Sequence, residues 1–226
     1  MSSILIRNAI IVNEGRSFRG DLLIKDEVIS AVGSASQVDI PKGSQIIDAS
    51  GLFLIPGVID DHVHFREPGL THKGDIYTES RAAAAGGITS FMDMPNTVPQ
   101  TVTIKDLNEK FRIASDKSVI NYSFYTGATN DNNSEILKAD PAEVCGIKVF
   151  LGSSTGNMLA DNEESLRILF KEALLPVAAH CEDEKIIRKN IDFYTKEYGD
   201  ELPFRMHPLI RSREACFKSA SYAVRL

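Results

Sequence analysis

The 226-residue sequence lacks the features that mark disulfide-rich, membrane-spanning and low-complexity proteins. Its three cysteines (Cys145, Cys181 and Cys216) form no CxxC pair, which argues against a disulfide framework or a thiolate zinc cluster. No run of about 18 apolar residues occurs, and the first residues do not have the pattern of a secretory leader, so we expect neither a membrane span nor export. Glycine and proline, at 15 and 9 residues, are too few for a collagen-like or disordered chain.

Positive charge is also in deficit. The 25 basic and 31 acidic residues give a net charge of −6, which disfavours nucleic acid or an anionic membrane surface as the main partner. Neither GxGxxG nor GxxxxGK[ST] follows an apolar run, so nucleotide-binding folds have no support. These absences leave a cytoplasmic enzyme with a small-molecule substrate as the first expectation, in one large domain or two small ones.

Residues 1–55 are expected to form a small β domain. Short runs of β-branched or alternating residues are separated by turn residues, and no stretch has helical periodicity over a useful length. We predict an antiparallel unit with strands at residues 4–6, 9–12, 21–24, 28–32 and 45–48.

Residues 56–226 are expected to form a second domain, because the pattern changes there to alternating strands and helices. Strands are predicted at 58–65, 90–94, 121–126, 146–150 and 176–181, and helices at 76–85, 104–115, 134–138, 163–172 and 183–190, with a last helix beginning at Ser212. Repeated βα units predict an α/β fold with a parallel sheet, either an open doubly wound sheet or a (β/α)₈ barrel.

Two histidines stand at the end of the first strand of this alternating region. Because alternate strand residues share a face, His62 and His64 can converge on one point, with Asp60 on the same face. Two neutral imidazoles so placed can bind a divalent metal, and barrel enzymes place their chemistry at the carboxyl ends of strands. The alternative is a pair of surface histidines.

Two further residues carry chemical signals in apolar strands. His180 closes the run 176–181 and would lie on the same rim as the first pair, or else be a core histidine bonded to the backbone. Lys148 interrupts the run 146–150, and a lysine is costly to bury without a purpose. A lysine of lowered pKa can react with carbon dioxide to give an anionic oxygen ligand, or form a Schiff base; the alternative is an edge-strand lysine with its ammonium in solvent.

Polar residues that follow the strands are candidate substrate contacts. Arg66 can grip a carboxylate through its guanidinium fork, and Asn96 can bond an amide or a carboxylate. Residues 153–156 are expected to be an ordinary polar turn, and His72 and His207 are not expected to be metal ligands.

The run from Pro56 to Gly69 (PGVIDDHVHFREPG) resembles the signature of the cyclic amidohydrolases, and most closely that of the dihydroorotases. Dihydropyrimidinases, hydantoinases and allantoinases are relatives. The runs GGIT at 86–89, MPNT at 94–97, KVF at 148–150 and AHCE at 179–182 resemble later blocks of the family in the same order.

The resemblance implies a metal-bearing (β/α)₈ barrel with a small β-sandwich to which residues 1–55 contribute. Two zinc ions per complete subunit are implied, and so is a homo-oligomer. Carried over by position, His62 and His64 would bind one zinc, a carboxylated Lys148 would bridge to the second, and His180 would bind that second ion. Arg66 and Asn96 would hold the substrate carboxylate. Some dihydroorotases have an aspartate in place of the bridging lysine.

The implied reaction is the reversible cyclisation of N-carbamoyl-L-aspartate to L-dihydroorotate in pyrimidine biosynthesis. Alternatives are a dihydropyrimidinase- or hydantoinase-like hydrolase of another cyclic amide, and a non-catalytic scaffold relative. The family also uses a further metal-binding histidine and a proton-shuttling aspartate, which cannot be assigned in this sequence. About five of the eight barrel units are expected, so we expect the missing residues beyond Leu226 and little activity from these 226 residues alone.

Overall fold

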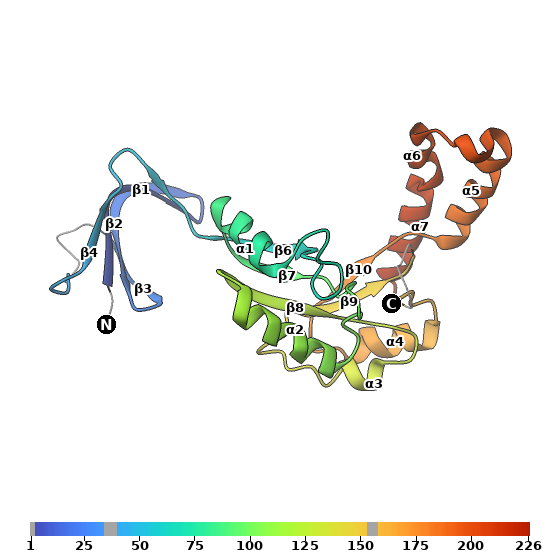
Figure 1. Cartoon of the computed structure of the whole chain (residues 1–226), viewed down its shortest axis with the longest axis horizontal. Coiled ribbons are helices and arrows are strands. Elements are labelled where there is room, and N and C mark those ends of the chain that lie inside the picture. Colours follow the sequence, from blue (N-terminus) through green and yellow to red (C-terminus); the bar gives the residue numbers. More distant parts are fainter. Residues whose placement is uncertain (1–2, 34–39, 153–157) are drawn as a thin grey trace. The chain divides into compact units, whose positions relative to one another are not determined.

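The computed structural model describes residues 3–33, 40–152 and 158–226, and it divides into two compact units, Met1–Gly57 and Val58–Leu226 (Figure 1). The two cores are separate: the apolar clusters of the first unit contain only residues before Gly57, and those of the second only residues after it. The predicted turn at 153–156 lies outside the described residues.

The first unit is one five-stranded sheet made of β1 (Ser3–Asn13), β2 (Arg16–Lys25), β3 (Val28–Gly33), β4 (Gln45–Asp48) and β5 (Phe53–Leu54). The strands β1, β2 and β3 pair antiparallel as expected. The prediction of a wholly antiparallel unit was wrong, because β4 and β5 both pair parallel to β1. The long connection between β3 and β4 allows the crossover that a parallel neighbour needs.

The runs predicted as two strands at 4–6 and 9–12 form the single strand β1. Its register shifts between Ile6 and Ala9, where Asn8 has a φ of 63°. The Asn8 N–H donates to Asp21 Oδ1 at 2.8 Å, which compensates for the interrupted ladder. A local irregularity, rather than a turn, therefore separates the two runs.

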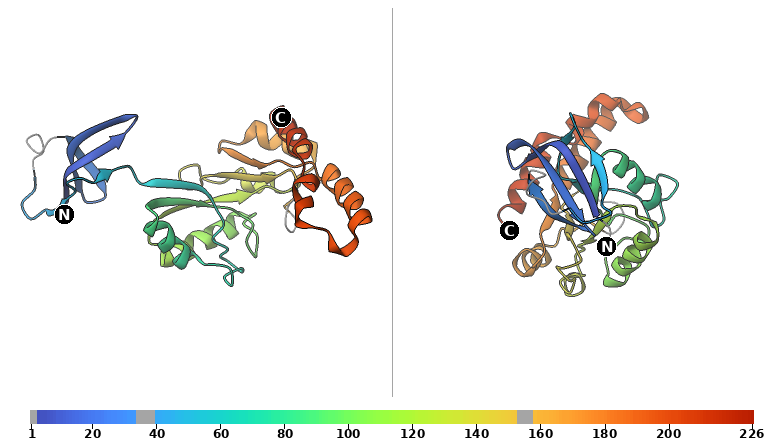
Figure 2. Two further views of the ribbon diagram at one scale, coloured as in Figure 1. Left: turned by 90° about the horizontal axis from the view of Figure 1, so that it is seen from above. Right: turned by 90° about the vertical axis from the view of Figure 1, so that its left-hand side faces the viewer.

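The second unit has a curled sheet of five parallel strands that lie side by side in chain order (Figure 2): β6 (Val58–Val63), β7 (Ile88–Asp93), β8 (Asn121–Gly127), β9 (Gly146–Phe150) and β10 (Val177–His180). Each strand is parallel to its neighbours. The expected α/β fold with a parallel sheet is confirmed, and the sheet corresponds to half of a barrel.

Helices connect these strands, and Figure 1 shows α2, α3 and α4 along one face of the sheet. Asp75 caps the first helix through a capping box with Thr78, and Asn162 and Ser212 cap later ones. Among the described residues no helix is long and apolar enough to cross a membrane. The helices are α1 (Ile76–Ala85), α2 (Ile104–Lys117), α3 (Asn133–Ile136), α4 (Glu163–Glu172), α5 (Glu184–Tyr198), α6 (His207–Ile210) and α7 (Arg213–Ala223), with 3₁₀ turns at Gly199–Glu201 and Phe204–Met206.

The prediction that the fifth helix ends near residue 190 was wrong, because α5 continues to Tyr198. Ile187 packs with Tyr194 and Tyr198 from the same helix in a small apolar cluster, which extends the buried stripe by two turns. The helix stops at Gly199, whose φ of +65° is unfavourable for other residues.

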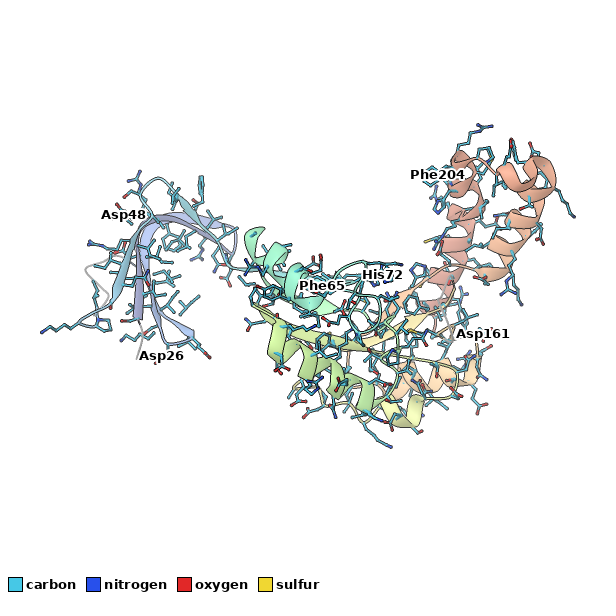
Figure 3. The ribbon with its side chains drawn as sticks, viewed as in Figure 1. Asp26, Asp48, Phe65, His72, Asp161 and Phe204 are labelled. Atoms are coloured by element: carbon cyan, nitrogen blue, oxygen red, sulfur yellow. The ribbon has the colours of Figure 1, made fainter. Side chains whose placement is uncertain are left out.

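The main core of the second unit lies between the sheet and its helices. Phe65, labelled in Figure 3, directly follows the predicted histidine pair, and its ring centroid lies 4.4 Å from that of Phe91 on β7. Phe124 on β8 continues the cluster at 6.3 Å from Phe91. This packing fixes the carboxyl end of β6, from which the candidate site is built.

Candidate active site

The predicted histidine ligands lie at or just after the carboxyl ends of two strands of the second unit, β6 and β10. His62 is on β6 and His64 immediately follows it, and their ring centroids are 5.4 Å apart. His180 is the last residue of β10. The alternation that predicted a shared direction for the first two histidines is consistent with this spacing.

Lys148 lies inside β9, where all five residues are buried, and it is only 4% exposed. Its Nζ lies 5.2 Å from the centre of the Phe150 ring. Burial lowers the pKa of the Lys148 ammonium. Because β9 pairs with both β8 and β10 and Lys148 is buried, the structure excludes the alternative of a solvated edge-strand lysine.

Burial is the main cause that lowers the pKa values of His62 and His64 below their ordinary value of 6.5. The charges of Lys148 and His180 also lower the pKa of His62. Neutral imidazoles are the form that binds metals.

His64 and His180 each contact a neighbouring polar side chain, through different ring nitrogens. His64 Nδ1 lies 2.9 Å from Asn96 Oδ1, and since an amide oxygen can only accept, Nδ1 carries the proton. His180 Nε2 lies 2.6 Å from Glu182 Oε2, and Arg211 Nε donates to Glu182 Oε1 at 2.7 Å. The nitrogens not used in these contacts are Nε2 of His64 and Nδ1 of His180.

Arg66 and Asn96 line one groove of about 540 Å³ beside His64, together with Leu70, Lys73, Thr97, Val98, Pro99 and Gln100. Arg66 has a φ of 68°, a left-handed conformation that is uncommon for a residue with a side chain. The Leu70 N–H donates to the Arg66 carbonyl at 2.9 Å, which closes the turn that holds it. Two cationic side chains and two amides make this groove suited to an anionic ligand.

The two remaining histidines are both exposed. His72, labelled in Figure 3, is exposed on the loop after β6, and His207 is exposed where it stacks on Phe204 at 5.7 Å. Histidine, cysteine and carboxylate side chains alone form no group of three that could hold a metal in the described parts of the chain. The predicted set is of another kind, because it includes a lysine.

Sequence reasoning missed two polar pairs next to the site. Glu182 and Arg211 are 29 residues apart, so only the fold shows that they meet. Lys110 Nζ lies 2.6 Å from Asp93 Oδ2, and both side chains are almost completely buried. The helical register of α2, in which Lys110 follows Leu107 on the core-facing stripe, is a signal that was available for the second pair.

Residues 51–190 match the family model described as "Dihydro-orotase-like". The chain belongs to this family. It therefore groups with the cyclic amidohydrolases, as the motifs in the sequence indicated.

Its relatives within the superfamily carry several names. The chain is 33% identical over 189 residues to the dihydroorotase of Lactobacillus johnsonii, covering 83% of this chain and 43% of that one. It is 35% identical to the allantoinase of Solibacter usitatus, covering 99% of this chain and 50% of that one.

Among solved structures, the L-hydantoinase (dihydropyrimidinase) from Arthrobacter aurescens superposes with a TM-score of 0.90 at 27% identity. That superposition covers 99% of this chain and 50% of the hydantoinase. This dihydro-orotase-like chain thus spans about half the length of the relatives it matches.

Proposed function

We propose that this chain carries the metal-binding part of a zinc-dependent cyclic amidohydrolase. The observation behind the proposal is the position of Lys148, an amine that is only 4% exposed on β9, next to the strand β10 that ends at His180. A cation is rarely buried without a partner. Reaction of this amine with carbon dioxide would replace the isolated cation by an anionic oxygen ligand.

The chemistry of the donor set fits a pair of zinc ions. His62 and His64 have lowered pKa values and are neutral near pH 7. His64 keeps Nε2 and His180 keeps Nδ1 outside the contacts that orient their rings. His62, His64, a carboxylated Lys148 and His180 are the residues that would hold the zinc.

Zinc, when bound, supplies Lewis acidity and lowers the pKa of water. The chain's own residues would hold the metal and orient the substrate. Burial around Lys148 keeps bulk water from its amine, Asn96 and Glu182 orient two of the imidazoles, and Arg66 binds the anionic end of the substrate.

Dihydroorotate is our preferred substrate, formed reversibly from N-carbamoyl-L-aspartate in pyrimidine biosynthesis. It has a ring carboxylate, which dihydropyrimidines and allantoin lack. An arginine in the groove would be an unpaired charge for those other substrates. A cytoplasmic location and a homo-oligomeric state stay predictions.

The second candidate is a hydantoinase- or allantoinase-like cyclic amide hydrolase. The observation in its favour is the match to an allantoinase and a hydantoinase over 99% of this chain, each covering half of the relative. A non-catalytic scaffold is the third, and it would be expected to have lost some of the four candidate ligands.

Substrate choice is tested by measuring hydrolysis of dihydroorotate, dihydrouracil and allantoin by the full-length protein and its Arg66→Ala variant. We expect dihydroorotate to be preferred and Arg66→Ala to lower its kcat/KM by roughly 10²-fold, the loss of one charge-assisted pair of hydrogen bonds. A preference for dihydrouracil that Arg66→Ala leaves unchanged would favour the second candidate.

The metal assignment is tested by zinc analysis and by ¹³C NMR after incubation with ¹³C-labelled bicarbonate. We expect bound zinc and a carbamate signal that Lys148→Arg abolishes. Protein without zinc would support the scaffold alternative, and zinc without a carbamate signal would overturn the role of Lys148.

A further inference from the structure

Lys110 occupies a core position on α2, between Leu107 and Ala114, and is completely buried. Its Nζ lies 2.6 Å from Asp93 Oδ2, donates to the Met94 carbonyl at 2.8 Å, and lies 4.9 Å from the centre of the Phe124 ring. An exposed helix face would have been the ordinary place for this residue.

These contacts join the carboxyl ends of two strands. The second oxygen of Asp93, Oδ1, accepts the Phe65 N–H at 2.9 Å, one residue after His64. The Met94 carbonyl accepts the hydrogen bond from Lys110 Nζ, and the Met94 N–H donates to the Val63 carbonyl at 3.0 Å. The ammonium therefore bonds directly to the backbone of β7 and, through Asp93, to that of β6.

The same two backbone segments carry His64 and Asn96, whose side chains contact each other in the candidate site. His64 precedes Phe65, and Asn96 lies two residues after Met94. Their side chains meet at 2.9 Å between Nδ1 and Oδ1. A small shift of either segment would break this hydrogen bond, because its geometry tolerates only a few tenths of an ångström.

Stability alone does not explain the pair. A buried ion pair loses solvation on both partners, and replacing one by apolar residues of the same volume is often neutral or favourable. A methionine at position 110 would fill the same space beside Phe124. The pair is better explained by the positions of the backbone segments that it holds than by the stability that it adds.

We infer that Lys110 is a positioning residue, which holds the ends of β6 and β7 so that His64 keeps its Nδ1 proton on Asn96 and leaves Nε2 free for a cation. The use of Nε2 to bind a cation rests on the proposed function. The orientation of the His64 ring does not, because it can be measured in the metal-free chain.

The test compares Lys110→Met with Leu107→Ala in the metal-free protein. Leu107 is 3% exposed on the same stripe of α2 and makes none of the polar contacts, so its truncation loosens the helix without touching Asp93. Ring ¹⁵N shifts of His64, measured above the ordinary imidazole pKa, report which nitrogen carries the proton.

We expect wild type and Leu107→Ala to show the Nδ1-protonated form, and Lys110→Met to show a mixture of the two tautomers. Zinc titration of Lys110→Met should give an affinity lower by roughly 10- to 100-fold, the range for loss of an orienting partner. An unchanged His64 tautomer in folded Lys110→Met, or the same mixture in Leu107→Ala, would overturn the inference.

The double variant Lys110→Met with Asp93→Asn decides the case if the single variant does not fold. It removes the uncompensated charge but keeps an oxygen for the Phe65 N–H. We expect the tautomer mixture to persist, and restoration of the wild-type tautomer would contradict a positioning role. If wild type binds no zinc but keeps its tautomer, the proposed function fails while the positioning result stands.

Discussion

Single side chains of the candidate site are held by neighbours on other segments. Asn96 holds His64, Glu182 holds His180, and Arg211 in turn binds Glu182. Asn96 and Glu182 lie on loops that follow strands of the parallel sheet, and Arg211 directly follows α6. The order of the site therefore depends on the order of the loops at this edge of the sheet. Single residues that anchor these loops are informative to mutate.

Asp75 is such an anchor at the start of α1, where its carboxylate accepts the Thr78 N–H at 2.7 Å. We expect Asp75→Ala to lower the free energy of unfolding of the second unit by about 0.5–2 kcal/mol at pH 7. Asp75→Asn, which retains the cap, is the matched control and should lose far less. Urea denaturation at pH 7 measures both, and equal losses would contradict a capping role.

The same side chain predicts a pH dependence. The Thr78 N–H holds the pKa of Asp75 below its ordinary value of 3.8, so the unfolded chain binds the proton more tightly than the folded one. The stabilisation is fully present above pH 3.8 and is lost as the pH falls through the lower folded pKa. The stability advantage of wild type over Asp75→Asn should shrink in acid, and an advantage that grows there would refute this sign.

At the scale of elements, the loops after β9 and β10 pass each other closely. A Cβ at Gly152 would clash with the Glu182 carbonyl oxygen, which is a backbone atom that cannot move aside alone. Gly86, at the end of α1, would place its Cβ at an ordinary 3.4 Å from the nearest atom.

We expect Gly152→Ala to displace the segment that holds Glu182 and to lower stability by about 1–3 kcal/mol, the usual cost of overpacking. Gly86→Ala should be nearly neutral. Thermal unfolding measures the first effect, and backbone amide shifts of residues 180–183 measure the displacement. Unchanged shifts in Gly152→Ala would show that the two loops are not in contact.

At the scale of the whole molecule, no apolar cluster of the described residues includes residues from both units. We expect residues 58–226, expressed alone, to keep the fold of the second unit, because every buried residue of its core cluster comes from that range. Overlay of amide spectra with the entire chain is the measurement. Collapse of those spectra would mean that the first unit contributes to the core.

Local patterns predicted much of the second unit. A lysine inside an apolar run identified Lys148, and strand alternation identified His62 and His64, since both signals depend only on neighbours in sequence. The parallel pairing of β4 and β5 with β1 had no such signal, because pairing partners are chosen by tertiary context. The pairing of Glu182 with Arg211, 29 residues apart in the sequence, was missed for the same reason.

The contact between His64 and Asn96 has one further consequence. An amide that accepts through Oδ1 still has two N–H donors, and Asn96 also lines the groove that holds Arg66. One planar group then faces a histidine on one side and an anion site on the other. Occupancy of the two sites would be thermodynamically linked, so that each ligand changes the affinity for the other by the same factor.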